Sequence, residues 1–129
     1  MNYYHAKQLT DIRFEEAVEK VTGVLKEEGF GILTEIDVQA TMKKKLDEEF
    51  RPYKILGACN PPFAWQALQA EDKIGTMLPC NVIVQEMDNH TVEVAAINPL
   101  ASMQAVDNKE LTHIAATIDG KLRAALDRL

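Results

Sequence analysis

The stretch that decides the fold is "LPCNVIVQEMDNHTVEVAAIN", residues 78–98. Alternate positions in both of its halves are apolar, and they are Leu78, Cys80, Val82 and Val84, then Val92, Val94 and Ala96. A period of two is typical of a strand with one buried face. Asp88 and Asn89 supply a turn between the halves. We therefore expect an antiparallel hairpin that faces the core with these apolar side chains.

The segment that follows the hairpin, "NKELTHIAATIDGKLRAALDRL", residues 108–129, predicts a long helix. One apolar stripe runs along it at spacings of three and four, formed by Leu111, Ile114, Ile118, Leu122, Leu126 and Leu129. About twenty-two residues at about 1.5 Å each reach about 33 Å. Five strands about 4.8 Å apart cover only about 24 Å, so this helix can cross a whole sheet.

A second long helix is predicted near the start of the chain, within "TDIRFEEAVEKVTGVLKEEGFG", residues 10–31. Phe14, Val18, Val21 and Leu25 form its apolar stripe. Asp11 is the expected N-cap. Gly29 suits the left-handed residue that ends a helix, and Phe30 can then fold back onto Leu25.

Three further strands and two short helices complete the prediction. We expect strands at residues 2–9, at "FGILTEIDV" (30–38) and at "YKILGACN" (53–60). The alternation in residues 30–38 places Leu33, Glu35 and Asp37 away from the core. Asp37 then caps one short helix, and Asn60 caps another in which Pro61 takes the first position.

This order of elements favours an α+β fold in one domain, residues 1–129. A mainly antiparallel sheet would carry the two long helices on one face, with short helices inserted between strands. A ferredoxin-like split arrangement is the rival topology.

Composition limits the classes of function. Twenty acidic residues against fourteen basic ones give a net charge of -6, and a surface of that sign repels phosphate backbones, so we expect no nucleic-acid partner. There is no export signal and no apolar run near the roughly twenty residues that span a bilayer, which predicts a cytoplasmic protein without membrane contact. The two cysteines are then expected to be reduced thiols.

Several motifs resemble one known family. "GFGILTEIDVQATMKKKL", "FRPYKILGACNPPFAWQAL", "LPCNVIVQE" and "VEVAAINPLASM" together are similar to the domain-of-unknown-function 302 family over essentially the whole chain. The resemblance implies a TATA-box-binding-protein-like β-α-β(4)-α fold, often a homodimer, with no established activity. It gives no catalytic residue, and the matching positions are pattern residues only: Cys59, Asn60, Pro61, Pro79, Cys80 and Pro99.

DNA binding does not follow from that fold, because fold similarity does not transfer function. The strand positions expected opposite the core carry no Lys or Arg, and they are Leu33, Glu35, Asp37, Asn81, Ile83, Gln85, Glu93, Ala95 and Ile97. A DNA-binding saddle needs basic and wedging aromatic side chains on that face.

The first functional hypothesis is a small-molecule-binding domain with a pocket between the sheet and the long helices. We expect the polar groups of that pocket to be Cys59, Asn60, Cys80 and Asn81. Tyr53 and Trp65 are close to the same strand-to-helix junction in the sequence and could wall the pocket.

The second hypothesis is thiol or metal chemistry at Cys59 and Cys80. A helix beginning at Asn60 and Pro61 would place Cys59 at its positive end, where a thiol pKa can fall. Two thiols do not complete a zinc site, which takes three or four protein ligands, and His5, His90 and His113 have no supporting spacing, so no metal site is predicted. Whether any reaction is catalysed, and with which cofactor, stays open.

The third hypothesis is a homodimeric assembly module without a ligand. Leu33, Ile83, Ala95 and Ile97 make the outer sheet face more apolar than solvent contact requires. Small residues four apart on the last helix, Ala116, Gly120 and Ala124, would let a partner helix approach closely, although plain solvent exposure also explains them.

Overall fold

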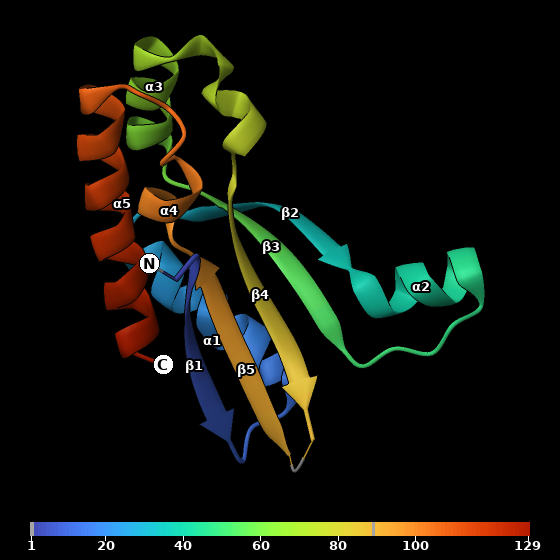
Figure 1. Ribbon diagram of the computed structural model, residues 1–129. Helices are drawn as coiled ribbons and strands as arrows, with labels where there is room; N and C mark the ends of the chain where they lie inside the picture. The colour runs from blue at the N-terminus through green and yellow to red at the C-terminus, as the bar shows by residue number, and fades with distance from the viewer. Residues whose placement is uncertain (1, 89) are drawn as a thin grey trace.

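The computed structural model describes residues 2–88 and 90–129. The first half of these residues forms β1 (Tyr4–Thr10), α1 (Phe14–Glu27), β2 (Gly31–Asp37), α2 (Val38–Leu46) and β3 (Tyr53–Cys59). The second half forms α3 (Pro61–Ala70), the 3₁₀ helix η1 (Asp72–Met77), β4 (Cys80–Met87), β5 (Thr91–Ile97), α4 (Pro99–Ser102) and α5 (Lys109–Asp127). The predicted α+β class is confirmed (Figure 1).

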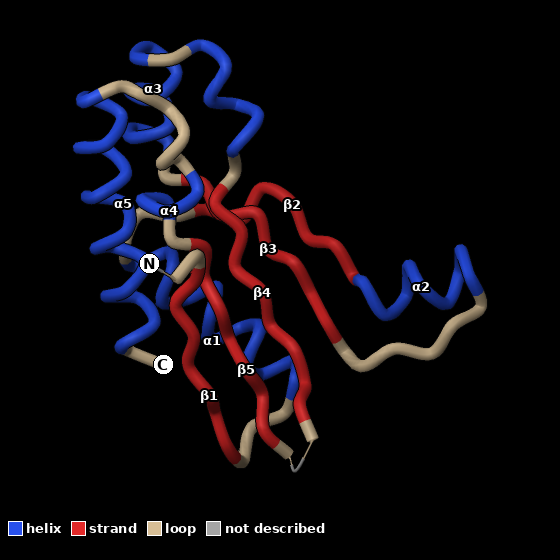
Figure 2. The backbone as a smooth tube through the Cα atoms, viewed as in Figure 1, coloured by secondary structure: helices blue, strands red, loops and turns tan. Residues whose placement is uncertain are grey.

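The five strands form one antiparallel sheet in the order β1-β5-β4-β3-β2. The long helices α1 and α5 pack against each other on one face of it, as predicted. Figure 2 shows the strands as one twisted layer with these helices on one side. Strands β2 to β5 are neighbours in chain order, so the ferredoxin-like alternative is wrong.

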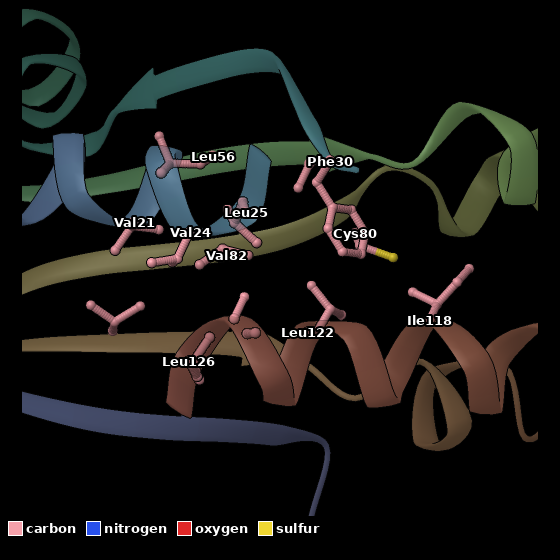
Figure 3. Packing of buried hydrophobic residues seen from close by; sticks show 14 of the residues in the cluster. Val21, Val24, Leu25, Phe30, Leu56, Cys80, Val82, Ile118, Leu122 and Leu126 are labelled. Atoms are coloured by element: carbon pink, nitrogen blue, oxygen red, sulfur yellow. The ribbon is translucent and has the colours of Figure 1, made fainter. Parts of the chain in front are cut away.

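The core lies between the sheet and the two long helices. Val82 pairs with Ala96 and Val84 with Val94 in the hairpin, and all four side chains are fully buried. The helices close this layer from the other side with Val21, Leu25, Leu122 and Leu126. Figure 3 shows side chains of both helices pointing toward those of β3 and β4. The predicted hairpin is confirmed, although Asn89 of its expected turn lies outside the described residues.

One prediction about β2 is wrong, because the strand contains a bulge. Ile32 pairs with Ala58 but Thr34 pairs with Gly57, so Leu33 is the extra residue. An extra residue reverses the alternation that follows it. Glu35 and Asp37 therefore lie on the helix side of the sheet, where Glu35 forms an ion pair of 2.7 Å with Lys54. The outer face receives Thr34 and Ile36 instead.

The end of α1 follows the sequence expectation and its start does not. The Phe30 amide donates to the Leu25 carbonyl at 2.9 Å, and Gly29 adopts a positive φ of 87°, which together form the predicted Schellman stop. The N-cap is Arg13 instead of Asp11, because Asp11 itself turns the chain with a φ of 56°. At α2 the predicted cap is confirmed, since the Asp37 carboxylate accepts a bond of 2.9 Å from the Ala40 amide.

Two short helices, η1 and α4, were not predicted, and a third helix, α2, lies outside the core. The sequence did not predict η1 or α4, both of which lie in the connections around β4 and β5. Helix α2 has no buried residue, and Figure 1 shows it standing apart from α1 and α5 beyond the β2 edge. Its last residue, Leu46, is 65% exposed.

Candidate functional site

A cavity of about 310 Å³ lies where β3 runs into α3. Its walls come from the start of β2, the β3–α3 junction, η1, the start of β4 and one side of α5. Almost all of the lining is apolar, and it consists of Phe30, Leu33, Ala58, Cys59, Asn60, Ala64, Ala67, Leu68, Gly75, Leu78, Pro79, Cys80, Met103, Ile114 and Ile118. The structure thus brings together three of the six predicted site residues, Cys59, Asn60 and Cys80.

Asn60 joins this cavity to the end of α1. Its position is the N-cap of α3, as predicted, but its side chain makes no capping bond there. Its Nδ2 instead donates to the Glu28 carbonyl at 3.1 Å, and a Cβ added to Gly29 would lie 3.2 Å from that nitrogen. Asn60 is 7% exposed. The amide therefore fastens two distant segments of the chain and forms one wall of the cavity.

The two thiols share the cavity although their strand positions differ. Cys80 pairs with Ala58, so strict alternation would direct the next residue, Cys59, to the opposite face. Strand β3 ends at Cys59, however, and the chain turns there into α3, so both residues line the same space. Neither cysteine is in a disulfide.

Burial controls the chemistry of these thiols. Burial, with a smaller effect from the charge of Cys59, raises the pKa of Cys80 from 9.0 to about 11. Burial also raises the pKa of Cys59, which is opposite to the direction expected from its place before α3. Both thiols are protonated at neutral pH, and a protonated thiol is a poor nucleophile. Burial therefore disfavours the thiolate form that cysteine nucleophilic catalysis requires.

Strands β2, β3 and β4 pack closely at Gly57, where Pro79 reaches the sheet. Gly57 of β3 lies between Thr34 of β2 and Asn81 of β4. A Cβ at Gly57 would lie 2.8 Å from Cγ of Pro79 and would also overlap the Thr34 hydroxyl. The missing side chain of Gly57 thus lets Pro79, which lines the cavity, approach the sheet.

The other predicted site residues lie elsewhere. Tyr53 and Asn81 line a groove of about 360 Å³ on the helix-free face of the sheet. Trp65 points into solvent from α3, with 67% of its surface exposed. The prediction that Tyr53 and Trp65 wall the cavity is wrong, because both are near the junction in sequence but not on its cavity side.

The outer groove holds most of the predicted interface residues of the sheet. Ile83, Ala95 and Ile97 form its floor, together with Gln85 and Glu93, and Tyr3 and Tyr4 contribute to its walls. Gln85 Oε1 accepts from Arg51 Nε at 2.8 Å, and Gln85 Nε2 donates to Glu93 at 2.9 Å. Arg51 precedes β3, so the strand pattern did not reveal this basic group at the outer face.

The remaining interface candidates lie on other surfaces. Leu33 is the bulged residue, 66% exposed at the rim of the cavity. On α5, Ala116 is exposed, whereas Gly120 and Ala124 are half-buried. A Cβ added to Gly120 would meet no atom within 4 Å, so this face of α5 has room for an added methyl group.

A buried carboxylate on α5 was missed by the sequence reasoning. Asp119 is 4% exposed, and its two oxygens lie 2.7 Å from His5 Nε2 and 3.2 Å from Arg123 Nε. The bond to His5 fastens β1 to α5, whereas Arg123 lies one turn further along α5 itself. The available signal was an acidic residue directly beside the apolar stripe, followed by an arginine four residues later.

The histidines do not combine with the two cavity cysteines to form a Cys and His metal site. His5 is bonded to Asp119, and His90 and His113 are exposed. Across residues 2–88 and 90–129, no group of three or more His, Cys, Asp or Glu side chains is placed to hold a metal ion. Within the same described part of the chain, no helix is both long and apolar enough to cross a membrane.

Comparisons with known proteins agree with this architecture. The family model described as "Domain of unknown function DUF302" matches residues 5–129. The chain is also similar to the crystal structure of an uncharacterized conserved protein DUF302 from Bacillus stearothermophilus, with a TM-score of 0.89 and 29% sequence identity. That alignment covers 98% of this chain and 97% of the other. Among curated proteins, none matches this chain.

Proposed function

This chain belongs to the DUF302 family of domains of unknown function, and we propose that it binds a small, neutral, apolar molecule in the cavity at the β3–α3 junction. The observation that carries this proposal is the cavity itself. Its volume of about 310 Å³ is at the lower end of the roughly 300–1,000 Å³ typical of ligand pockets. At about 30 Å³ for each water-sized group, such a space suits a ligand of about ten non-hydrogen atoms.

The lining supports a neutral ligand. The described residues around the cavity include no charged side chain, and the raised pKa values of Cys59 and Cys80 keep both thiols uncharged at neutral pH. A charged guest would lose its hydration without gaining a compensating ion pair. Asn60 is the one amide side chain in the wall, which suits a ligand with a single polar group.

Exposed apolar side chains at the rim support access from solvent. Leu33 and Leu68 line the cavity and are 66% and 41% exposed. A bound apolar molecule would remove part of this surface from water, at about 25 cal/mol for each Å². The rim thus favours an occupant that enters from outside.

A neutral apolar dye, N-phenyl-1-naphthylamine, tests this proposal. Trp65 is the single tryptophan of the chain, and it lies on α3, which also carries the cavity residues Ala64 and Ala67. Energy transfer from Trp65 to the dye therefore reports binding near α3. We expect saturable transfer with the unmodified protein.

Two alanines of α3 provide a matched pair of variants. Ala64 lines the cavity and Ala70 does not. Ala64→Phe should fill the space and abolish the saturable transfer, whereas Ala70→Phe should leave it unchanged. Equal transfer in all three proteins, or none in the unmodified protein, would exclude the cavity as a ligand site.

A second candidate function is homodimer formation through the outer groove. The observation that favours it is the floor of Ile83, Ala95 and Ile97 on a sheet face that no described helix covers. Sedimentation equilibrium should give a dimer that Ile83→Lys dissociates and Leu46→Lys, on exposed α2, does not. A monomeric unmodified protein excludes this role.

We place the protein in the cytoplasm as part of the same proposal. Both cysteines are free thiols, which suits a reducing compartment. Fractionation of cells that express the full chain should recover it in the cytosolic fraction, and recovery from an oxidising compartment would contradict this placement.

A further inference from the structure

We propose that the sulfur atoms of Cys59, Cys80 and Met103, which line the cavity, form a binding site for a soft monovalent metal ion, Cu(I). This site needs only the three sulfurs and goes beyond the proposed binding of an apolar molecule. The two proposals therefore fail by different experiments.

The fold brings the three sulfur-bearing residues to one space from separate segments. Cys59 ends β3, Cys80 begins β4, and Met103 follows α4, yet all three line the same cavity. Pairing of Ala58 with Cys80 holds the first two in neighbouring strands. Figure 3 shows the Cys80 sulfur pointing away from its strand, on the side where Ile118 of α5 lies.

The chemistry of the lining selects a soft ion. Thiolate and thioether sulfur favour Cu(I), whereas carboxylates and carbonyls favour Mg²⁺, Ca²⁺ and Mn²⁺. The described residues around the cavity include neither a carboxylate nor an imidazole. Structural zinc takes four ligands from Cys, His, Asp and Glu, and this cavity supplies only two such residues. Three sulfurs, by contrast, are a sufficient donor set for Cu(I).

Binding must displace protons. Each cysteine thiol loses one proton to solvent as its sulfur–copper bond forms, the Met103 thioether donates a lone pair without losing a proton, and copper stays Cu(I). The complex carries one negative charge, and Cys59 is only half-buried, so water can reach the charged end of the site. Because each thiol must lose its proton before its sulfur binds the ion, affinity for Cu(I) should increase as pH rises from 6 to 9.

The test is an anaerobic titration of the fully reduced protein with Cu(I) against a chromophoric Cu(I) chelator. We expect one ion per chain. Loss of a residue that only supports a metal ligand lowers affinity by roughly 10–100-fold. Cys59→Ser and Cys80→Ser each remove a ligand, so each should lower the affinity for Cu(I) by more than that. Met103→Leu, which keeps the volume, should weaken it on the order of tenfold, at the low end of that range. Met87→Leu at the far end of β4 is the matched control and should bind as the unmodified protein does.

A thermal melt separates a built site from ordinary thiol binding. Cu(I) should raise the melting temperature of the unmodified protein, because only the folded chain holds the three sulfurs together. Unchanged affinity in either serine variant, or equal affinity for the chain unfolded in urea, would overturn the site. Dye binding without Cu(I) binding by the unmodified protein would overturn this site alone, and Cu(I) binding without dye transfer would overturn the apolar-ligand proposal alone.

Discussion

Replacement of glycine by alanine should have opposite effects at two positions of this protein. At Gly57 the added Cβ would lie 2.8 Å from Cγ of Pro79 and overlap the Thr34 hydroxyl. Overpacking of this kind costs about 1–3 kcal/mol. At Gly120, inside α5, the added Cβ meets nothing within 4 Å, and alanine in a helix interior is favoured over glycine by about 1 kcal/mol. Gly57→Ala should therefore destabilise the fold and Gly120→Ala should stabilise it.

Urea unfolding followed by circular dichroism measures both free energies of unfolding. For a chain of this length, each kcal/mol also moves the melting temperature by about 4 °C. Because the Thr34 hydroxyl is the nearest obstacle to a side chain at Gly57, the double variant Gly57→Ala, Thr34→Ala should recover part of the loss. The overlap with Pro79 remains in that variant, so recovery should be incomplete.

Two results would refute this reasoning. If Gly57→Ala is as stable as the unmodified protein, the close approach of Pro79 to the sheet does not exist. If Thr34→Ala gives no recovery and the two changes simply add, the two positions are not in contact. A destabilising Gly120→Ala would instead place a neighbour against that face of α5, as the homodimer hypothesis allowed.

Three further predictions concern buried polar groups. Asp119→Ala should cost about 1–3 kcal/mol, because it removes the bond that joins α5 to His5 of β1. A double-mutant cycle with His5→Ala in urea unfolding should give a coupling of about 0.5–3 kcal/mol. Asn60→Ala should cost about 1–3 kcal/mol through the lost bond to the Glu28 carbonyl, seen by the same method. The free energy of unfolding should also fall as pH rises from 9 to 11. Burial raises the pKa of Cys80 in the folded protein from 9.0 to about 11, so over this range the unfolded chain loses the thiol proton while the folded protein keeps it.

Controls accompany each of these predictions. Additivity of the Asp119 and His5 changes would contradict the ion pair between them. An Asn60→Ala variant of full stability would mean that the bond to α1 contributes nothing. The contribution of Cys80 to the pH effect on unfolding should reach about 2–3 kcal/mol, from about 1.4 kcal/mol for each tenfold change in proton affinity. The effect should be smaller in Cys80→Ala, in which only the raised pKa of Cys59 still contributes in the same direction. The same slope in that variant would assign the effect to other groups.

Elements decided by neighbouring residues were predictable. The end of α1 needs only Gly29, Phe30 and Leu25, all within five positions, and these residues form the expected stop. The hairpin of β4 and β5 was equally local, because its period of two is complete in each strand. Fold class and the apolar faces of α1 and α5 follow from such patterns.

Features decided by distant contacts were not predictable. "FGILTEIDV" alternates without interruption, yet β2 has a bulge at Leu33. No residue within β2 signals it, since the register is set against β3, more than twenty positions away. Asn60 shows the same limit, because its residue type indicated a cap while its actual partner, the Glu28 carbonyl, lies in another helix end.

The same distinction between local patterns and distant contacts applies to the residues of the candidate site. Cys59, Asn60 and Cys80 line one cavity because β3 and β4 are neighbours in the sheet, which the chain order allowed but did not establish. Trp65 and Tyr53 were assigned by closeness in sequence, and the faces of α3 and β3 on which they lie separate them from the cavity. Met103 has no sequence signal at all, since it reaches the cavity only through the docking of α4.

The most direct test of the central claim is a crystal structure of the protein under xenon pressure, compared with the same crystal form without gas. Xenon enters apolar cavities that water leaves empty. We predict xenon density between Ala64 of α3 and Ile118 of α5, and none in an Ala64→Phe crystal. A chain of ordered water molecules in this space, with no xenon, would contradict the claim that the cavity receives an apolar molecule.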